Sequence, residues 1–380
     1  MNVANSVVPM NTDEREVVRL HLTNIVGLGA VRLMQSLLPS LVTQYRYRIG
    51  EVYLPASGGL SNFSLFENET VQSYYKRYLP NAISRLLECT LFGSKFDGAT
   101  PLLVFGDIPI KCKSNQTVFV QTTLLIRGSK TGRQLGAIKY WVARWLFRRN
   151  MQYASKFIVQ TEAMKSSLGE SYPEIKGLIH VVGQPAPDWL ITSQLKRTKF
   201  HDSPEPGLKF FYPAAAYPHK NHRILNQIDQ SASWPISELI LTIPANLNPN
   251  PAIPWIRCVD TLEPVAVLDA YQTADALLFL SLSESFGFPL VEAMWIGLPI
   301  ICPDLPYARI LCGEQAIYFD PDNVVSLYAA VVDLNKRRNS GWWPNWERQL
   351  ALIPKDWDTV AEAMIDVACN SKFKKTDEKG

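Results

Sequence analysis

The sequence lacks the short patterns that identify a zinc site, a disulfide scaffold or a metalloprotease. Its six cysteines form no CxxC pair, and its five histidines include no HExxH motif. The cysteines are therefore expected to be buried free thiols in a reducing compartment. The formal net charge is only +3, so bulk charge gives no reason to expect a nucleic acid as a partner.

Membrane-spanning and secretory patterns are also missing. No run of about 18 apolar residues occurs, which is roughly the length that crosses a bilayer as a helix. The first residues are polar and acidic and lack the basic and apolar regions of a signal peptide. These features predict a cytoplasmic protein that is either soluble or in contact with the inner face of the membrane.

Length and composition favour a two-domain α/β protein. A chain of 380 residues exceeds the size at which single cores usually split. Apolar residues make up 47 % and charged residues 19 %, an ordinary globular balance that excludes general disorder. Short apolar runs alternate with longer helical patterns, as is typical of mostly parallel sheets. The sequence therefore predicts sheets with connecting helices.

The alternation restarts after a polar segment, residues 192–207, which contains two prolines and a glycine. Such a composition favours a linker. We therefore expect an N-terminal domain over residues 1–200 and a C-terminal domain over residues 208–355. A last amphipathic pattern over residues 356–369 predicts a helix, which we expect to pack back on the N-terminal domain.

Individual elements follow from the same patterns. Strands are expected at 17–26, 102–106, 117–121, 156–160, 178–182, 208–212, 237–243, 276–281, 298–302 and 316–319. Helices are expected at 220–230, 264–273, 289–296 and 323–336. An earlier helix begins at Ala30 and is expected to end at Pro39, because proline lacks the N–H that a helix interior needs.

The densest chemical signal is residues 281–297, SLSESFGFPLVEAMWIG. Pro289 suits the first position of a helix and Gly297 suits its end. Gly287 allows the backbone to approach a ligand closely. The turn before Pro289 therefore lies at the carboxyl end of a strand and the N-terminus of a helix. Sheets of this kind bind ligands there, and the free N–H groups and helix dipole favour a diphosphate.

Two glutamates flank this helix start. Glu284 lies in the turn and Glu292 in the first part of the helix. Their carboxylates could accept hydrogen bonds from the hydroxyls of a sugar and of a ribose. Taken singly, each glutamate is more simply a turn residue or a helix starter that complements the dipole. The functional interpretation depends on the segments around them.

Those segments resemble a known family. ESFGFPLVEAM, with seven residues between Glu284 and Glu292, resembles the E-x7-E signature of retaining GT-B glycosyltransferases of family 4. Residues 267–279 resemble the helix and strand that lead into it, and residues 211–221 resemble the loop that carries a phosphate-binding lysine. The resemblance is strong over residues 208–335, whereas the N-terminal half matches only in outline.

The resemblance implies a GT-B fold, in which two Rossmann-like domains face each other across a cleft. It implies a retaining hexosyltransferase that moves a hexose from a nucleoside-diphosphate sugar to a glycan or lipid-linked glycan acceptor, in the synthesis of a surface polysaccharide. In the implied same-side mechanism the leaving phosphate helps to deprotonate the acceptor hydroxyl, and Glu284 positions the sugar. Two alternatives stay open: another GT-B enzyme, such as a sugar-nucleotide epimerase or phosphorylase, and a catalytically silent partner that binds nucleotide or sugar.

The resemblance also assigns residues to the donor. Lys220 is the candidate clamp, because a lysine beside the diphosphate neutralises the charge that develops as the nucleotide leaves. Many members carry an arginine six residues earlier, where this sequence has Ala214. Either another basic residue completes the clamp or the phosphates are held differently. The other donor-binding candidates are Glu292, Phe286, Gly287, Phe288, Gly27 and Gly29.

Gly27 and Gly29 resemble the glycine loop with which the N-terminal domain of the family approaches the donor phosphates. By itself GLGAVR is a weak motif, since it lacks the third glycine of a dinucleotide fingerprint. Gln121 ends an expected strand where many family members carry a histidine, so it is a candidate residue of the cleft.

No metal or other cofactor is expected apart from the nucleotide sugar itself. Asp320 and Asp322 form a literal DxD, a metal-binding pattern in the other large glycosyltransferase fold. Here they follow a short strand and precede a helix, which favours a turn and a helix cap. The helix N-terminus and Lys220 would supply the positive charge that a divalent ion provides elsewhere.

A separate signal lies in the helical pattern of residues 137–149, where basic and aromatic side chains alternate. Such a helix suits a lipid interface. The alternative is a domain helix with a solvated basic face. At helical spacing the central residues share one stripe, which either faces outward or buries its tryptophans. The candidate membrane contact is Lys139, Trp141, Arg144, Trp145 and Arg148, with a smaller echo at residues 74–77.

Overall fold

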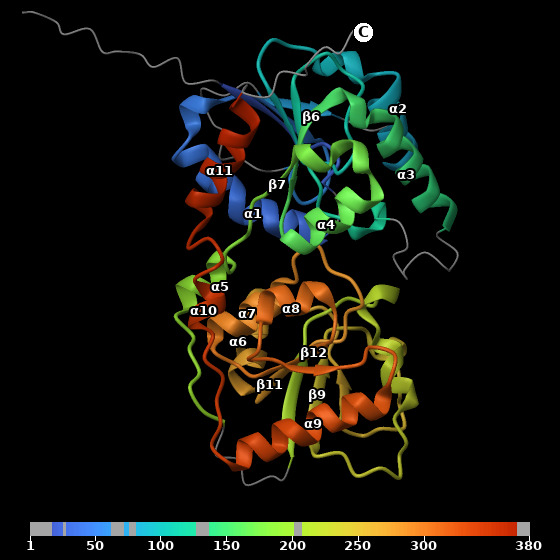
Figure 1. Ribbon diagram of the computed structural model, residues 1–380, viewed down its shortest axis with the longest axis vertical. Helices are drawn as coiled ribbons and strands as arrows, with labels where there is room; N and C mark the ends of the chain where they lie inside the picture. Colours follow the sequence, from blue (N-terminus) through green and yellow to red (C-terminus); the bar gives the residue numbers. More distant parts are fainter. Residues whose placement is uncertain are drawn as a thin grey trace, which may run out of the picture.

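The computed structural model describes residues 17–25, 28–61, 72–75, 81–126, 137–200 and 207–370. The described chain forms two sheets, one in the upper and one in the lower half of Figure 1, each flanked by helices. Every strand pair in this part of the chain is parallel. The prediction of an α/β protein with parallel sheets is confirmed.

The N-terminal sheet has seven strands. They are β1 (Val18–His21), β2 (Ile49–Pro55), β3 (Gln72–Tyr75), β4 (Leu102–Val104), β5 (Gln116–Phe119), β6 (Ala154–Val159) and β7 (Ile179–Val181). Their order is β3-β2-β1-β4-β5-β6-β7, so the direction of strand addition reverses between β1 and β4. The short strands are mostly apolar, as expected where helices cover both faces.

The C-terminal sheet has six strands. They are β8 (Leu208–Tyr212), β9 (Ile236–Leu241), β10 (Ile256–Cys258), β11 (Ala276–Leu278), β12 (Ile300–Pro303) and β13 (Ile317–Phe319). Their order is β10-β9-β8-β11-β12-β13, so the reversal here falls between β8 and β11. The reversal marks the point where this class of sheet binds ligands.

The helices connect these strands. They are α1 (Leu28–Thr43), α2 (Asn81–Thr90), α3 (Ala137–Asn150), α4 (Glu162–Ser171), α5 (Asp188–Ser193), α6 (Pro264–Thr273), α7 (Phe288–Ile296), α8 (Pro306–Cys312), α9 (Val324–Asn339), α10 (Glu347–Leu350) and α11 (Trp357–Cys369). Within the described residues, no helix combines the length and the apolar character needed to cross a bilayer.

Each sheet has its own core. Apolar side chains from the C-terminal sheet and its helices form one large buried cluster. Alternating residues of the N-terminal strands build two clusters on opposite faces of their sheet. α11 joins the N-terminal cluster that contains α1, with Trp357 and Met364 buried there, and Figure 1 shows the two helices side by side. The last described helix therefore packs on the N-terminal half.

The chain leaves the N-terminal sheet after Val182. Ala186 and Leu190 already belong to the C-terminal core, so α5 packs with the C-terminal half. The polar segment that follows also packs there, because the backbone N–H of Arg197 donates to the carbonyl of Ile296 at 2.7 Å. The domain limits given above stay a prediction. In the structure, the chain crosses from the N-terminal core to the C-terminal core between Val182 and Ala186, before those limits.

The expectation that Pro39 ends the first helix is wrong. α1 continues through Pro39 to Thr43, and Leu41 and Val42 in the continuation are buried. Proline removes one hydrogen bond from a helix interior. Packing of the last turn into the core, together with a 2.9 Å hydrogen bond from the Thr43 hydroxyl to the Pro39 carbonyl, outweighs that loss.

Two other expectations need correction. The helix expected over residues 220–230 is a short 3-10 segment, His222–Gln227. The strands β2, β3 and β10 were not expected. β10 has only three residues at the edge of its sheet, too few for an alternating pattern to identify.

Candidate functional site

The two loops that carry the predicted donor residues meet at the reversal point of the C-terminal sheet. β8 and β11 are neighbours, with Phe210 opposite Ala276. Lys220 lies in the loop after β8 and Glu284 in the loop after β11. Because parallel strands end at the same edge of a sheet, both side chains come together where this class of sheet binds ligands.

Lys220 and Glu284 form an ion pair. The Lys220 Nζ donates to Glu284 Oε1 at 2.5 Å, and the two side chains are 16 % and 12 % exposed. The Phe279 ring lies nearby, with its centroid 6.0 Å from Nζ. A charge-assisted hydrogen bond of this kind fixes both groups, yet both keep some exposure. The cation is thus in place for an anionic ligand, and the carboxylate for a hydroxyl.

Buried polar contacts hold Lys220 in position. It ends a 3-10 turn, and the following Asn221 has a positive φ of 55°. The buried Tyr212 hydroxyl donates to the Lys220 carbonyl at 2.8 Å. The backbone N–H of Leu282 donates to the His219 carbonyl at 2.7 Å, which joins the two loops directly. The loop after β8 is therefore fixed relative to the loop after β11.

The turn before α7 is largely enclosed by the protein, with Phe286 and Gly287 both buried. Phe286 is buried in the C-terminal core, and its ring centroid lies 5.0 Å from that of Phe288. Gly287 has a φ of 92°, a conformation that side-chain-bearing residues rarely adopt. Phe288 packs against both the C-terminal core and the core around α1. Packing on both sides therefore fixes the backbone of this turn at the start of α7.

Glu292 lies on the inner side of α7 and is only 9 % exposed. Its Oε2 accepts a 2.7 Å hydrogen bond from the hydroxyl of Tyr271 on α6. Burial raises the pKa of Glu292 to about 7, against smaller lowering effects of Tyr271 and of the positive charge on Arg32. Glu292 is thus close to half ionised at neutral pH, and Arg32 on α1 acts on it from the N-terminal half.

The N-terminal half contributes less of the predicted site. Gly29 is exposed in the first turn of α1, and a Cβ there would meet no atom within 4 Å. Gly27 lies outside the described residues. Gln121 is half-buried after β5, and its amide nitrogen donates to the Phe105 carbonyl at 3.2 Å. Its side chain is thus engaged by the end of β4.

Sequence reasoning missed Asp107, which follows β4. It has a positive φ of 63°, and its Oδ1 accepts a 2.6 Å hydrogen bond from the Gln121 backbone N–H. Burial raises the pKa of Asp107, although Arg85 lies only 3.8 Å away. A Gly-Asp pair directly after an apolar strand was the available signal, since such pairs favour tight turns.

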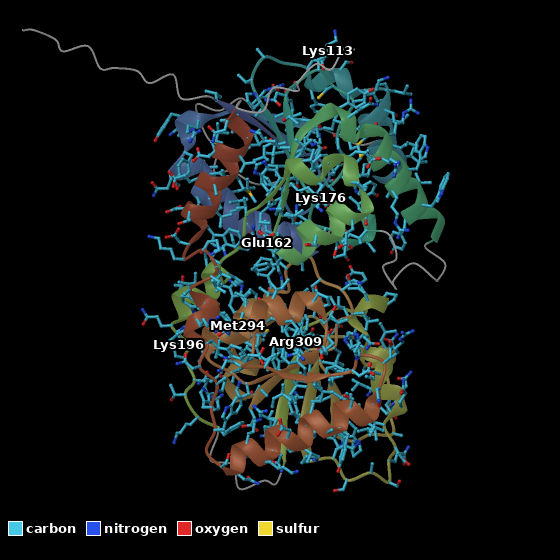
Figure 2. All side chains as sticks on the ribbon, in the orientation of Figure 1. Lys113, Glu162, Lys176, Lys196, Met294 and Arg309 are labelled. Atoms are coloured by element: carbon cyan, nitrogen blue, oxygen red, sulfur yellow. The ribbon has the colours of Figure 1, made fainter. Side chains whose placement is uncertain are left out.

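A second missed residue is Thr161, which joins the two halves. Its Oγ1 accepts the 3.1 Å hydrogen bond that caps α4 and donates to the Ser285 carbonyl at 3.2 Å. Figure 2 shows the two facing sides, with Glu162 on α4 above and Met294 on α7 below. The turn that contains Glu284 is therefore in contact with the N-terminal half.

The candidate membrane helix, α3, turns its tryptophans outward. Trp141 is 65 % and Trp145 44 % exposed. The Arg149 guanidinium lies 5.4 Å from the Trp145 ring centroid. Leu146 and Phe147, on the opposite face, are buried. Of the two orientations that the sequence allowed, the structure has the outward one.

The arginines of α3 are partly engaged. Arg148 Nη2 lies 2.6 Å from Glu174 Oε1, and Arg144 Nε donates to the Leu124 carbonyl at 2.9 Å. The side chain of Lys139 and residues 76–77 lie outside the described part of the chain. The exposed basic and aromatic character of α3 is therefore carried mainly by Trp141, Trp145 and Arg149.

The DxD pattern forms a turn. Asp320 Oδ1 accepts a 3.1 Å hydrogen bond from the backbone N–H of Asp322, and Asn323 caps α9. In the part of the chain that the structure describes, no group of three or more His, Cys, Asp or Glu side chains is placed to hold a metal ion.

Comparisons with known proteins agree with this geometry. Residues 248–337 match the family model described as glycosyl transferases group 1. The serotype-specific mannosyltransferase WbdA of Escherichia coli is 21 % identical over 237 residues, which is 60 % of this chain and 28 % of that protein. The chain thus spans less than a third of the length of this relative.

Solved structures share the fold. The lipopolysaccharide outer core galactosyltransferase WaaB matches with a TM-score of 0.58 and 13 % identity, over 94 % of this chain and 99 % of that one. Anabaena Alr3699/HepE, solved in complex with UDP and glucose, matches with a TM-score of 0.53 and 13 % identity, over 93 % and 95 %. The predicted GT-B fold is confirmed, and the resemblance to family 4 is confirmed by the match of residues 248–337 to the model of group 1 glycosyltransferases.

Proposed function

We propose that this chain is a retaining hexosyltransferase that moves a hexose from a nucleoside-diphosphate sugar to a glycan or lipid-linked glycan acceptor. The observation that carries the proposal is the Lys220–Glu284 pair, placed at the reversal point of the C-terminal sheet beside the N-terminus of α7. A cation, a helix N-terminus and a carboxylate within one loop pair match the parts of a sugar diphosphate.

The diphosphate is the part of the donor that needs positive charge. Backbone N–H groups at the start of α7 and the Lys220 ammonium would bind it, and both stabilise the charge that grows on the leaving nucleotide. A bound phosphate would compete with Glu284 for Lys220. Glu284 would then be free to accept hydrogen bonds from the hexose hydroxyls.

The reaction makes one bond and breaks one. The acceptor oxygen bonds to the anomeric carbon of the hexose as the bond from that carbon to the diphosphate oxygen breaks. In the same-side course that the family resemblance implies, the acceptor proton passes to the leaving diphosphate and the anomeric configuration is retained. The positive charge of Lys220 stabilises the negative charge that develops on the leaving diphosphate oxygen.

Several names among the similar proteins suggest the class of product. WbdA is named as a mannosyltransferase and WaaB as a galactosyltransferase of the lipopolysaccharide outer core, and HepE was solved with UDP and glucose. The first two names share the transfer of a hexose, and the third protein binds a nucleotide; we extend only these two features to this chain. Surface polysaccharide synthesis is the setting that the first two names support.

We also propose that the N-terminal half contacts an anionic membrane through α3. The exposed Trp141, Trp145 and Arg149 support this, because tryptophan prefers the headgroup region and arginine is attracted by anionic lipid. A lipid-linked acceptor would then be presented from the membrane to the N-terminal side of the enzyme. The proposal places the working enzyme at the inner face of the cytoplasmic membrane.

The test is a panel of nucleoside diphosphates and their hexose derivatives, followed first by thermal unfolding. A ligand that binds only the folded protein raises the unfolding temperature, by an amount that grows with the logarithm of its concentration relative to Kd. The donor so identified is then incubated with glycan acceptors, and the product is analysed by mass spectrometry and NMR. Turnover without an acceptor would indicate an epimerase, and binding without turnover a silent partner. No shift with any nucleotide would contradict the proposal.

A further inference from the structure

Tyr271 is a buried tyrosine whose single polar atom points at a proposed donor residue. The side chain is 0 % exposed, and its hydroxyl donates to Glu292 Oε2 at 2.7 Å. Its ring packs edge-on against Phe211 of β8, with the centroids 4.9 Å apart and the planes at 90°. Because a strand of the sheet holds the ring, the direction of the hydroxyl is fixed by the core.

Tyr271 belongs to a set of three buried tyrosines that support the site from behind. Tyr212 on β8 donates to the carbonyl of Lys220, and Tyr307 on α8 donates to the carbonyl of Ser281. Both of those hydroxyls donate to backbone carbonyls and so fix the position of a loop. Among the three, Tyr271 is the one whose hydroxyl reaches a side chain that we propose to touch the donor. Its effect is therefore on one carboxylate rather than on a loop.

The contact with Tyr271 uses one of the two oxygens of the Glu292 carboxylate. Oε2 is taken by Tyr271, and Glu292 as a whole keeps 9 % exposure. Burial raises the pKa of Tyr271 well above its usual value, so the phenol stays a donor at every physiological pH. A phenol that donates favours the ionised form of its partner. The free oxygen can then accept hydrogen bonds from a ligand.

We infer that Tyr271 is a positioning residue for nucleotide recognition, which holds Glu292 as an oriented acceptor for the two ribose hydroxyls of the donor. The inference rests on the proposed function, since it needs a nucleotide with its ribose beside α7. It extends that function, because the preference for a ribose then depends on Tyr271, a residue that does not itself contact the donor. Removing the phenol should weaken ribose recognition and spare the rest of the nucleotide.

The ionisable groups around Glu292 determine how its carboxylate responds to pH. Tyr271 acts from α6 and Arg32 from α1, and both lower the pKa of Glu292 against the opposing effect of burial. Replacing the phenol removes one of the two. The pH below which ribonucleotide affinity declines should therefore move upward in Tyr271→Phe, in a direction that a purely structural role would not produce.

The experiment uses the full chain and isothermal titration with UDP, GDP and ADP. The nucleotide that binds is then compared with its 2′,3′-dideoxy form, for wild type and Tyr271→Phe. We expect the wild type to bind the ribonucleotide about tenfold more tightly than the dideoxy form, the scale of one or two hydrogen bonds to a charged group. In Tyr271→Phe most of that preference should be lost, while dideoxy affinity stays within about twofold.

Tyr318→Phe is the matched control. It removes a half-buried phenol of the same half, which donates to the Gly313 carbonyl at 2.6 Å. Ribose preference should survive in it. Equal weakening of ribo and dideoxy forms in Tyr271→Phe would overturn the inference and leave the proposed function intact. A wild type that binds none of the three nucleotides would overturn the proposed function, and the inference with it.

Wild type and Glu292→Gln carry the test if Tyr271→Phe does not fold. The ribose preference of the wild type, which is the ratio of ribonucleotide to dideoxynucleotide affinity, should fall as the pH drops below about 7, where Glu292 takes up its proton. Glu292→Gln has no carboxylate to protonate at this position, so its ribose preference should not change over the same pH range. A ribose preference of the wild type that does not change with pH would overturn the inference.

Discussion

The two sheets reverse their strand order in the same way, but their carboxyl edges are equipped differently. At the C-terminal edge the Lys220–Glu284 pair keeps partial exposure, and a helix begins beside it. At the N-terminal edge, Glu88 of α2, which is 12 % exposed, contacts two polar groups at the end of β1. His21 is fully buried, with its Nε2 2.6 Å from Glu88 Oε1, and Thr23 Oγ1 donates to the same carboxylate.

The difference suggests a division of labour. A pair whose two members both keep some exposure can exchange a protein partner for a ligand, whereas a carboxylate held by the fully buried His21 mainly fixes the chain around it. The C-terminal edge is therefore suited to a charged donor. At the N-terminal edge Asp107 accepts a hydrogen bond from the Gln121 backbone, and we propose that the acceptor binds on this side.

The largest expected effect is on the C-terminal edge. Lys220→Ala should reduce transfer by roughly 10²-fold or more, because one electrostatic stabiliser of the leaving group is lost. Initial rates at saturating donor measure this. Lys176→Ala, on the surface of the N-terminal half (Figure 2), is the matched control and should be near wild type. Glu284→Gln should likewise lower turnover more than stability. Near-normal rates in both site variants would remove the functional contrast between the two edges.

The next effect concerns Glu292 and pH. Its pKa is raised from 4.5 to about 7 by burial, so the folded state holds its proton more tightly than the unfolded state does. The associated stability is present below pH 4.5 and is lost as the pH rises through 7. Relative to Glu292→Gln, the wild type should therefore lose up to about 3 kcal/mol of unfolding free energy between these limits. Denaturant titrations at several pH values test it, and parallel curves for the two proteins would contradict it.

The N-terminal edge should respond in stability rather than in donor binding. Glu88→Leu removes the carboxylate that His21 and Thr23 contact and leaves buried polar groups unsatisfied. We expect a loss of about 1–3 kcal/mol in unfolding free energy. Nucleotide affinity, measured in the same preparation, should remain close to that of the wild type. A large loss of donor affinity would mean that the two edges are more tightly coupled than proposed.

A smaller effect is expected at α3. Trp141→Ser/Trp145→Ser should weaken co-sedimentation with anionic vesicles, and Arg149→Glu should weaken it by about 1 kcal/mol at most. Arg144 and Arg148 should matter less, since both are engaged by protein groups. Leu352→Ser/Val325→Ser, which alters exposed apolar residues elsewhere, is the control. Equal binding by all variants, or none by the wild type, would leave α3 as ordinary surface.

The smallest expected effect is that of chelation. Transfer should continue in EDTA, because Lys220 and the start of α7 are proposed to supply the positive charge at the diphosphate. Complete loss of activity that magnesium or manganese restores would return Asp320 and Asp322 to consideration as ligands. The measurement is the rate in EDTA relative to the rate with either metal added.

The C-terminal half was easier to predict than the N-terminal half for a physical reason. There the decisive residues lie within one strand, turn and helix start, and Gly287 and Pro289 are needed locally by the backbone. The position of Glu284 after a strand followed from that pattern. On the N-terminal side, Asp107 contacts Gln121 from a separate loop, and Thr161 contacts Ser285 of the other half. No local sequence pattern predicts either contact.

The sequence by itself determined the alternation of strands and helices, the glycine and proline limits of the donor turn, and the spacing of its two glutamates. Tertiary structure decided that α1 runs through Pro39, that the α3 tryptophans face solvent, and that Tyr271 reaches Glu292 from another helix. Backbone preferences act over a few neighbouring residues and can be read along the chain. Which side chains meet, and which are buried, depends on the packing of elements far apart in sequence, where core contacts outweigh local preference.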